Sequence, residues 1–573
     1  MKYIEDFRRL PWSQILYHGA LGLWYTNINF SQENTRSEEK RLSNKIKETE
    51  QKEQNFLYEK LKEYCSSDAY PFHMPGHKRN KTLIKELLGG VYGDGMPYQI
   101  DITEIDGFDN LHHAEEILLE GQKRAADLYG AEESFYLING STCGILASVF
   151  ACTAQKGKIL MARNCHKAVY HAAELRELET VYLYPQLFSD GDTIWQGTAQ
   201  INGPIAPEDV VKALKRNPGI EAVVITSPTY DGVVSDVKRI AEIAHNYKIP
   251  LIVDEAHGAH FGFHSYFPEN SLKHGADLVI HSLHKTLPSL TQTALLHRGK
   301  KSRINSERVR KYLDIFETSS PSYVFMAGID QCIRLIKEHG AELFDLYTRR
   351  IQRFREETAH LAHIHLLPDR GRVQYSSERD SVTDDKNKRV VVDPGKLVIA
   401  ADSLSGQELA EILRREYHLE VEMAAAGYVI ALTSLADTEE GFLRLKNALI
   451  HIDKMISTTY VERQRKAQTE TYYDGQAQQT VPTENRFDRD TKQVMTIAKA
   501  AKSNMWTVDL GDSAGQVSGE YIYLYPPGIP LAVPGEQITE KLIAHIQDMQ
   551  RKGLEIQGLR DYTGKKVDVC RKV

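Results

Sequence analysis

The sequence predicts an α/β fold with a mostly parallel sheet, joined to a small αβ domain and a C-terminal α+β domain. Between residues 134 and 294, short apolar runs alternate with segments of helical periodicity, which is the pattern of strand–helix–strand units. The seven apolar runs are FYLIN, KILMA, TVYLY, AVVIT, PLIVD, DLVIH and TALLH. With 573 residues, the chain is also long enough for several domains and a large core.

The overall composition argues against two classes of partner. The formal net charge is -7 and the isoelectric point is about 6.4, so nothing attracts the chain to nucleic acid. The apolar run at residues 15–25 is too short to span a membrane and lacks the order of regions of a signal peptide. The six cysteines form no CxxC pair and no zinc-ligand spacing, which indicates reduced thiols in a cytoplasmic protein.

Residues 1–70 are predicted to form a charged helical N-terminal extension. Residues 33–64 are rich in Glu, Lys, Arg and Gln, which predicts a solvated helix with only its last turns packed on the body of the protein. The sparse apolar positions are Ile46, Phe56, Leu57 and Leu61. Residues before about 51 are expected to be poorly ordered, with a partner contact as the alternative.

Two segments contain acidic residues or histidines that could be taken for metal ligands. Residues 101–113 read DITEIDGFDNLHH, but the Gly and the final Glu of an EF-hand loop are misplaced, so no EF-hand is expected. The family resemblance described below implies a structural segment ahead of an amphipathic helix here instead. His257, His260 and His264 begin just beyond a strand and run through two glycines, so no regular helix holds them on one face. The sequence therefore predicts no metal site.

A lysine follows the apolar run DLVIH. The segment SLHK places Lys285 at the mouth of a buried strand, where desolvation disfavours the ammonium form. A lysine with a lowered pKa can form a Schiff base with an aldehyde cofactor, and Ser282 and His284 beside it can hold a phosphate group. The alternative is a surface loop with a solvated lysine.

Two further strand ends offer what such a cofactor needs. Asp254 ends the run PLIVD, and ligands bind beyond the carboxyl ends of strands in open α/β sheets. A carboxylate there keeps the ring nitrogen of pyridoxal phosphate protonated, so that the ring acts as an electron sink. The segment NGSTCG leads into a helix, and its backbone N–H groups with Ser141, Thr142 and Cys143 form an anion site.

Two more predicted strands end near polar residues. His166 follows KILMA, which predicts a place beside the cofactor, with a hydrogen-bonded loop histidine as the alternative. Thr229 follows AVVIT in the segment SPTYDG. It either reaches the phenolic oxygen of the cofactor or belongs to a plain proline turn.

Seven segments, in this order, resemble the Orn/Lys/Arg decarboxylase family of pyridoxal phosphate enzymes, which has the aspartate-aminotransferase-like fold. They are PFHMPGHK (71–78), DITEIDGFDNLHH (101–113), NGSTCG (139–144), RNCHKA (163–168), DEAHGAH (254–260), SLHK (282–285) and YPPGIPLAVPGE (525–536). The resemblance extends from about residue 54 to the C-terminus. It is closest to the shorter branch, which includes bacterial arginine decarboxylases, because the chain before Pro71 has no room for the receiver-like domain of the longer branch.

The resemblance implies a role for most of these residues. Lys285 carries the cofactor aldehyde, Asp254 pairs with the ring nitrogen and His166 stacks on the ring. Ala256 packs against the ring and His257 lies beside the reactive carbon. Either Lys285 or His257 returns a proton to the substrate. The residues implied to hold the phosphate are Ser141, Thr142, Ser282 and His284.

The resemblance also implies a homodimer and a basic substrate. The segment ETSSPSY, residues 317–323, resembles the part that reaches the neighbouring subunit, where Ser319 or Ser320 helps to hold the cofactor. The segment before YPPG lines the distal end of the substrate site in the family. In this sequence the segment reads GQVSGEYIYL, and its only acidic residue is Glu520. Glu520 is therefore expected to pair with the cation of the substrate.

The expected domains follow from the same patterns. They are the extension 1–70, a large pyridoxal phosphate domain 71–345, a small αβ domain 346–463, a linker 464–489 and a C-terminal decarboxylase domain 490–573. A long helix over residues 323–355 joins the large and small domains. Ser405 is the expected N-cap of a small-domain helix, with Glu408 at the capping-box position.

Together these features predict a cytoplasmic decarboxylase of a basic amino acid. Arginine is preferred by resemblance, which gives agmatine for polyamine synthesis, while lysine and ornithine stay open because one carboxylate accepts a guanidinium or an ammonium. Transamination or aldol cleavage on the same fold, and a non-catalytic protein that binds pyridoxal phosphate, also stay open. The expected partners are a small-molecule substrate and further copies of the chain, with no nucleic acid and no membrane.

Overall fold

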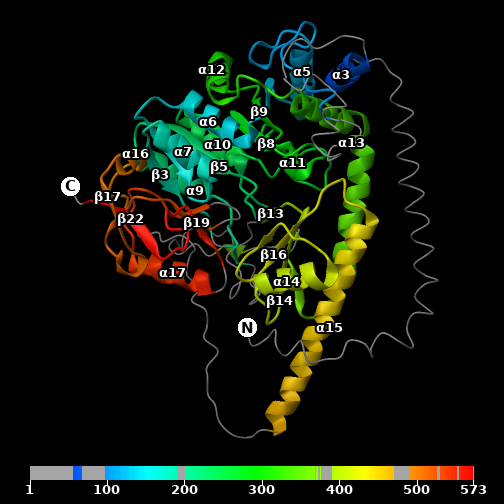
Figure 1. The fold of residues 1–573 in the computed structure, drawn as a ribbon, viewed down its shortest axis with the longest axis vertical. Coiled ribbons are helices and arrows are strands. Elements are labelled where there is room, and N and C mark those ends of the chain that lie inside the picture. Colours follow the sequence, from blue (N-terminus) through cyan, green and yellow to red (C-terminus); the bar gives the residue numbers. More distant parts are fainter. Residues whose placement is uncertain are drawn as a thin grey trace, which may run out of the picture. The chain divides into compact units, whose positions relative to one another are not determined.

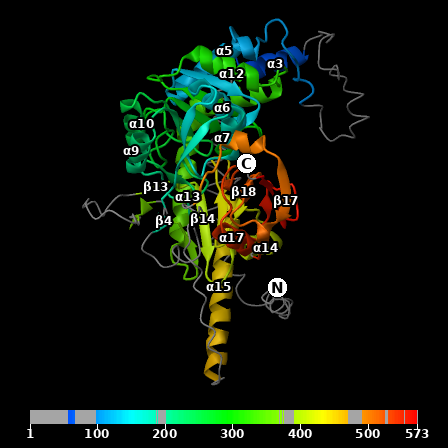
Figure 2. The ribbon, with the colours of Figure 1, turned by 90° about the vertical axis from the view of Figure 1, so that its left-hand side faces the viewer.

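A computed structural model describes most of the chain from residue 56 onward (Figures 1 and 2). The described residues are 56–66, 97–186, 188–189, 201–367, 370–371, 374–375, 390–469, 491–524, 529–551 and 554–571. They all belong to one compact unit, Asn55–Val573. The extension before residue 56, the motif PFHMPGHK, most of the predicted linker and the YPPG part of the last motif lie outside the described residues.

The seven predicted strands form one sheet in the order β1-β9-β8-β7-β5-β2-β3. They are β1 (Glu133–Leu137), β2 (Lys158–Ala162), β3 (Glu179–Leu183), β5 (Ile220–Thr226), β7 (Leu251–Asp254), β8 (Leu278–Ser282) and β9 (Ala294–Arg298). The strands from β8 to β3 are parallel to one another, whereas β9 runs antiparallel to β8 and β1. The expected mostly parallel sheet is confirmed.

Both faces of this sheet are buried. On β1, Phe135 and Leu137 belong to one apolar core, while Tyr136 on the same strand belongs to another. The same division holds on β9, where Leu296 and Leu295 face opposite cores. Burial on both faces explains why the strands read as continuous apolar runs instead of an alternation with polar residues.

Helices cover the two faces (Figures 1 and 2). On one side, α6 (Gly140–Cys152) packs on α7 (Lys167–Leu175) and α12 (Ser306–Phe316), and α9 (Pro207–Arg216) packs on α10 (Val237–Asn246). On the other, α5 (Ile117–Tyr129) packs on β1 and on the long helix α13 (Tyr323–Thr358). Helix α3 (Leu57–Ser66) contacts α13, and its residues Leu57 and Leu61 are buried, so the predicted packing of these last turns is confirmed.

The small domain follows α13, as the sequence predicts. Its sheet has the order β10-β14-β16-β15, and α15 packs on α13 (Figure 1). The elements are β10 (Ile364–Leu366), β14 (Lys396–Ala401), α14 (Gly406–Tyr417), β15 (Met423–Ala424), β16 (Val429–Leu432) and α15 (Glu439–Thr469). The predicted capping box begins α14: the Ser405 side chain accepts from the Glu408 N–H, and the Glu408 carboxylate accepts from the Ser405 N–H.

The C-terminal domain contains two three-stranded sheets, ordered β17-β22-β18 and β20-β19-β21. Its elements are α16 (Ile497–Ala501), β17 (Met505–Asp509), η2 (Leu510–Asp512), β18 (Val517–Ser518), β19 (Ile522–Leu524), β20 (Ile529–Ala532), α17 (Glu540–Arg551), β21 (Ile556–Gln557) and β22 (Lys566–Cys570). The remaining short elements among the described residues are η1 (Leu111–His113), β4 (Phe188–Ser189), β6 (Val233–Val234), α11 (Leu283–Thr286), β11 (Arg370–Gly371), β12 (Gln374–Tyr375) and β13 (Val390–Val392).

The structure bears on two expectations from composition and on the segment DITEIDGFDNLHH. The cysteines at 143, 152, 165, 332 and 570 are free thiols. In the described part of the chain, no helix combines the length and apolarity needed to cross a membrane. In the predicted structural segment, the Asp109 carboxylate accepts backbone N–H groups of Glu115, Glu116 and Leu118 and so organises the start of α5, which is a structural use of an acidic side chain.

Candidate active site

A cavity of about 390 Å³ lies at the carboxyl ends of the central strands. This volume falls in the range of small-molecule sites. The large domain contributes Asn139, Gly140, Ser141, Thr142, Ile145, Asn164, His166, Thr226, Pro228, Tyr230, Asp254, Ala256, His257, Ser282, His284, Lys285 and Gln292. Glu422 of the small domain and Ile529 of β20 complete the wall. Residues from five of the seven segments singled out in the sequence, and from SPTYDG, meet at one place. Most of them do so because parallel strands bring their carboxyl ends to one edge of the sheet.

One end of the cavity has the features of a phosphate site. Helix α6 begins at Gly140, whose φ of 73° is in the left-handed region that glycine adopts without strain. The next residue, Ser141, places its Oγ 2.6 Å from Oγ of Ser282. An anion can bind here, because the backbone N–H groups at the start of a thirteen-residue helix and two adjacent hydroxyl groups can donate hydrogen bonds to it.

His284 has a defined tautomer at this end of the cavity. Its Nδ1 lies 3.0 Å from the carbonyl oxygen of Thr293, so Nδ1–H donates and Nε2 has no proton while the ring is neutral. Burial lowers the pKa of His284, with the charge of Lys285 acting in the same direction. The ring can therefore donate to a phosphate through Nε2 only after it gains a proton.

Four predicted cofactor residues do not line the cavity, and two of them, Cys143 and Thr229, lie in the large domain close to it. Cys143 is buried, and this desolvation, followed by the charge of the adjacent Glu317, raises the pKa of the thiol far above its usual range. The Thr229 hydroxyl accepts from the Val233 N–H at 3.1 Å and lies within a tight turn. The alternative reading of SPTYDG as a proline turn is the one the structure favours. Thr226 and Tyr230 line the cavity in place of Thr229.

Asp254 is 4% exposed at the end of β7. Its Oδ1 accepts the N–H of Ala256 at 3.2 Å. Burial raises the pKa of this carboxyl group, and the charge of Lys285 acts in the opposite direction. A buried carboxylate of this kind gains most from a cationic partner, which a protonated pyridine nitrogen supplies.

His166 lies at the junction of β2 and α7. Its Nδ1 accepts the N–H of Ala168 at 3.2 Å and caps α7, so the proton of the neutral ring is on Nε2. Burial, followed by the charge of Lys285, lowers the pKa of His166 to about 3. The ring is therefore neutral near pH 7 and suited to stacking on a flat heterocycle.

Lys285 lies in α11, just beyond β8, and its Nζ is 3.0 Å from Nε2 of His257. Burial lowers the pKa of Lys285, whereas Asp254 and then Glu422 raise it. His257 is buried, and desolvation lowers the pKa of its ring. The lysine and the histidine thus form one hydrogen-bonded unit inside the cavity.

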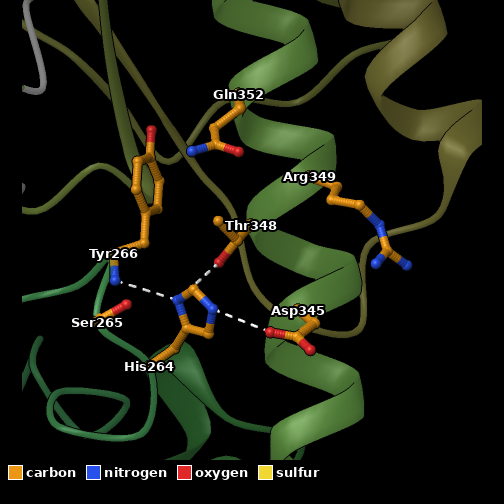
Figure 3. A pocket seen from close by; sticks show the side chains of 7 residues that line it. All are labelled: His264, Ser265, Tyr266, Asp345, Thr348, Arg349 and Gln352. Atoms are coloured by element: carbon orange, nitrogen blue, oxygen red, sulfur yellow. Dashed lines mark hydrogen bonds and ion pairs between the residues drawn. The ribbon is translucent and has the colours of Figure 1, made fainter.

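The three histidines tested above for zinc binding have separate partners. His260 Nε2 is 3.1 Å from Oδ1 of Asp393, whereas His257 faces Lys285. Figure 3 shows His264 turned toward α13, where its Nε2 lies 3.0 Å from Oδ1 of Asp345. Within the described residues, no group of His, Cys, Asp and Glu side chains could hold a metal ion.

Three predicted residues lie away from the cavity within one chain. Ser319 and Ser320 are exposed on the segment before α13. Glu520 is part of the C-terminal domain, where its oxygens accept the N–H groups of Arg560 at 2.6 Å and Asp568 at 2.7 Å. Within one chain, Glu520 does not line this cavity, and its carboxylate holds two backbone amides of its own domain.

Some wall residues were missed by sequence reasoning. Asn164 and Thr226 are next to predicted residues, and their position at strand ends is a signal that could have identified them. Glu422 directly precedes β15 of the small domain, in the segment LEVEM, and accepts from the Tyr230 hydroxyl at 2.5 Å. Its sequence context contains no motif, so only the packing of the small domain on the large one reveals it.

The cavity fits pyridoxal phosphate. Two buried polar atoms of residues in its wall, Asn164 Oδ1 and Thr226 Oγ1, have no hydrogen-bond partner among the described residues and can serve a ligand. The helix start offers a phosphate site, Asp254 a partner for the ring nitrogen and Lys285 an amine for the aldehyde. Bound there, the cofactor supplies an electron sink for the pair of electrons left when a bond to the substrate α-carbon breaks.

Comparison with known proteins gives a consistent result. The family model described as "Orn/Lys/Arg decarboxylase, major domain" matches residues 55–440, and the model of the C-terminal domain matches residues 480–563. The Bacillus subtilis protein YaaO, described as uncharacterized, is 32% identical over 88% of this chain and 95% of its own. An arginine decarboxylase of the same organism is 28% identical over 88% of this chain and 96% of its own. The structure of the Escherichia coli constitutive lysine decarboxylase shares the fold, with a TM-score of 0.73 and 21% identity over 90% of this chain and 82% of its own.

Proposed function

The chain belongs to the Orn/Lys/Arg decarboxylase family, and from this we propose that its preferred substrate is arginine, converted to agmatine. Membership makes it a pyridoxal phosphate-dependent decarboxylase of a basic amino acid. The choice of arginine is supported by the Bacillus subtilis relative named arginine decarboxylase, which matches along nearly its whole length.

The observation that carries the site assignment is the convergence of Lys285, Asp254 and His166 on one cavity with a helix N-terminus. Lys285 binds the cofactor aldehyde, Asp254 holds the ring nitrogen in its protonated form, and His166 covers the ring. Ser141 and Ser282, 2.6 Å apart, hold the phosphate with the N-terminus of α6. These residues position the bond between the substrate α-carbon and its carboxylate for cleavage and keep the reacting atoms away from bulk water.

The test is a product analysis with purified protein and pyridoxal phosphate. Arginine, lysine, ornithine and several neutral amino acids are supplied separately, and CO₂, amine and keto acid are measured. Agmatine with an equal amount of CO₂, and the highest kcat/KM for arginine, is the expected result. Keto acid in place of CO₂ would contradict decarboxylation, and a higher kcat/KM for lysine or ornithine would contradict the arginine preference. The Lys285→Ala variant is the control and should lose both turnover and the visible absorbance of the bound cofactor.

A further inference from the structure

A second lysine lies behind the site. Lys396 is the first residue of β14 in the small domain and is fully buried. Its Nζ lies 2.7 Å from Nδ1 of His257 and 2.9 Å from the carbonyl oxygen of Tyr230. Because Nε2 of His257 contacts Lys285 at 3.0 Å, one imidazole ring joins two lysine side chains.

The hydrogen-bond chemistry of this array allows two arrangements. In the first, Lys396 is an ammonium that donates to Tyr230 and to Nδ1 of His257. Nε2–H of His257 then donates to Lys285, which must be a free amine with a lone pair. In the second, Nδ1–H of His257 donates to a neutral Lys396 amine, which still donates to Tyr230, and Nε2 accepts from a Lys285 ammonium. The two arrangements contain the same number of protons and differ in which lysine is charged.

The surroundings favour one charge on the array over two. Two ammonium groups on opposite sides of one buried imidazole repel each other, and burial penalises each of them. The charged groups that face Lys396 are Lys285, the carboxylates of Asp231 and Glu422, and Asp393, which also binds His260. Burial lowers the pKa of Lys396 to about 8, with Asp393 opposing and the charge of Lys285 reinforcing that shift.

We propose that Lys396, His257 and Lys285 share one excess proton, and that Lys396 holds it while Lys285 acts as a free amine. Lys396 is a positioning residue in this scheme, because it acts on the reaction through His257. The proposal deepens the proposed function, since a lysine that binds an aldehyde must first be a free amine and later can act as an acid.

The transfer is balanced in bonds and charge. An Nζ–H bond of Lys396 breaks as the Nδ1–H bond of His257 forms, and the Nε2–H bond of His257 breaks as an N–H bond of Lys285 forms. Lys285 can then give this proton to the substrate carbon, where a C–H bond replaces the bond to the departing CO₂. Decarboxylation consumes one proton per turnover, and solvent returns it to the array.

The first experiment uses cofactor-free protein, so it does not depend on any decarboxylase activity. Cyanate modifies free amines, and peptide mass spectrometry of the Lys285 peptide at a series of pH values gives the midpoint of Lys285 deprotonation. Lys396→Met removes the stored charge, so the midpoint should rise by about one pH unit, which means tenfold less free amine at a given pH. Lys396→Arg keeps a cation beside His257 and should leave the midpoint unchanged. Thr433→Val is the matched control, because Thr433 binds the carbonyl of Gly395 next to Lys396 without contacting His257.

The second experiment uses holoenzyme and its pH profile. In the wild type, kcat should fall as pH rises through about 8, where Lys396 loses its proton. Lys396→Arg cannot release a proton, so its kcat should be at least about tenfold lower than that of the wild type, with no fall in this pH range.

Identical midpoints of Lys285 deprotonation in the wild type and in Lys396→Met would overturn the proposal. If Lys396→Met does not fold, a wild-type kcat and pH profile in Lys396→Arg would overturn it. A protein that modifies as expected but decarboxylates no amino acid would contradict the proposed function and leave the shared proton established.

Discussion

Arg163 and Glu536 form a buried ion pair, with 3.0 Å between Nη2 and Oε2, that joins the end of β2 to the C-terminal domain. The guanidinium also donates to the carbonyl oxygens of Pro530 at 2.7 Å and Leu531 at 3.0 Å. These bonds hold β20 beside the segment that carries His166. They thereby place a residue of β20 in the cavity wall, so the C-terminal domain is part of the site.

Glu536→Ala should destabilise the protein by about 3–5 kcal/mol, because it leaves the Arg163 guanidinium buried without its counter-charge. The matched control is Glu177→Ala, which removes a solvent-exposed ion pair, 2.5 Å long, with Lys502. Exposed pairs contribute little, so this variant should unfold like the wild type. Urea unfolding of both variants checks the prediction, and equal effects would show that burial of the pair is not what matters.

Asp254→Asn should keep the fold but lower kcat by ~100-fold, or about 3 kcal/mol of barrier. The amide cannot hold a proton on the ring nitrogen, and the neutral ring is a poor electron sink. Circular dichroism and the amount of bound cofactor serve as controls for folding and binding. Wild-type turnover in Asp254→Asn would show that this residue is not the partner of the ring nitrogen.

Local patterns predicted the sheet and most of the cavity. Lys285, Asp254 and Ser141 are at strand ends or at a helix start, and the βα topology fixes where those ends meet. Lys396 and Glu422 were missed because they reach the site only through packing of the small domain on the large one. The position of Glu520 outside the cavity of its own chain could not be predicted either, since nearness to YPPG in sequence does not say which backbone amides a carboxylate will bind.

The carboxyl group of Glu317 should make stability depend on pH. It is buried where ETSSPSY begins, accepts the N–H of Asn139 at 3.1 Å, and burial raises its pKa from 4.5 to about 6. The folded protein thus binds this proton more tightly than the unfolded chain, so its stabilising contribution is complete below pH 4.5 and is lost as pH rises through about 6. The loss amounts to about 2 kcal/mol.

Glu317→Gln isolates this contribution, because glutamine stays neutral. The variant should match the wild type near pH 4.5 and exceed it by up to about 2 kcal/mol near pH 8. Urea unfolding at both pH values gives the difference. A constant difference between the two proteins across this range would show that Glu317 keeps an ordinary pKa.

A homodimer with shared sites is the next prediction. Ser319 and Ser320 are exposed and outside the cavity of their own chain, as expected of residues that serve a neighbour. A variant with both serines changed to alanine should be nearly inactive, and so should Lys285→Ala. When the serine double variant and Lys285→Ala are mixed and reassembled, about half of the dimers should be hybrids with one intact site out of two. The mixture should therefore recover up to roughly a quarter of wild-type activity. Sedimentation velocity measures the oligomeric state, and a monomer or a mixture without activity would refute the prediction.

The substrate cation is predicted to meet Glu422. Of the described residues that line the cavity, the acids are Asp254 and Glu422, and the first is buried where the ring nitrogen is expected. Glu422 accepts the hydroxyl of Tyr230 with one oxygen and is the carboxylate left to pair with a basic amino acid. A hydrogen bond to a charged group contributes about 1.5–3 kcal/mol, so Glu422→Gln should raise KM for arginine, lysine and ornithine roughly 10- to 100-fold.

The comparison with Glu520→Gln makes this prediction decisive. Both carboxylate oxygens of Glu520 accept backbone N–H groups, so the substitution should lower the Tm of the protein while KM for arginine stays within about twofold. Neutral amino acids serve as the internal control, since their residual turnover does not depend on a cation partner. If Glu520→Gln raises KM for the basic substrates steeply and Glu422→Gln does not, then Glu520 is the residue that binds the substrate cation. That outcome would require the C-terminal domain to reach a site other than the cavity of its own chain.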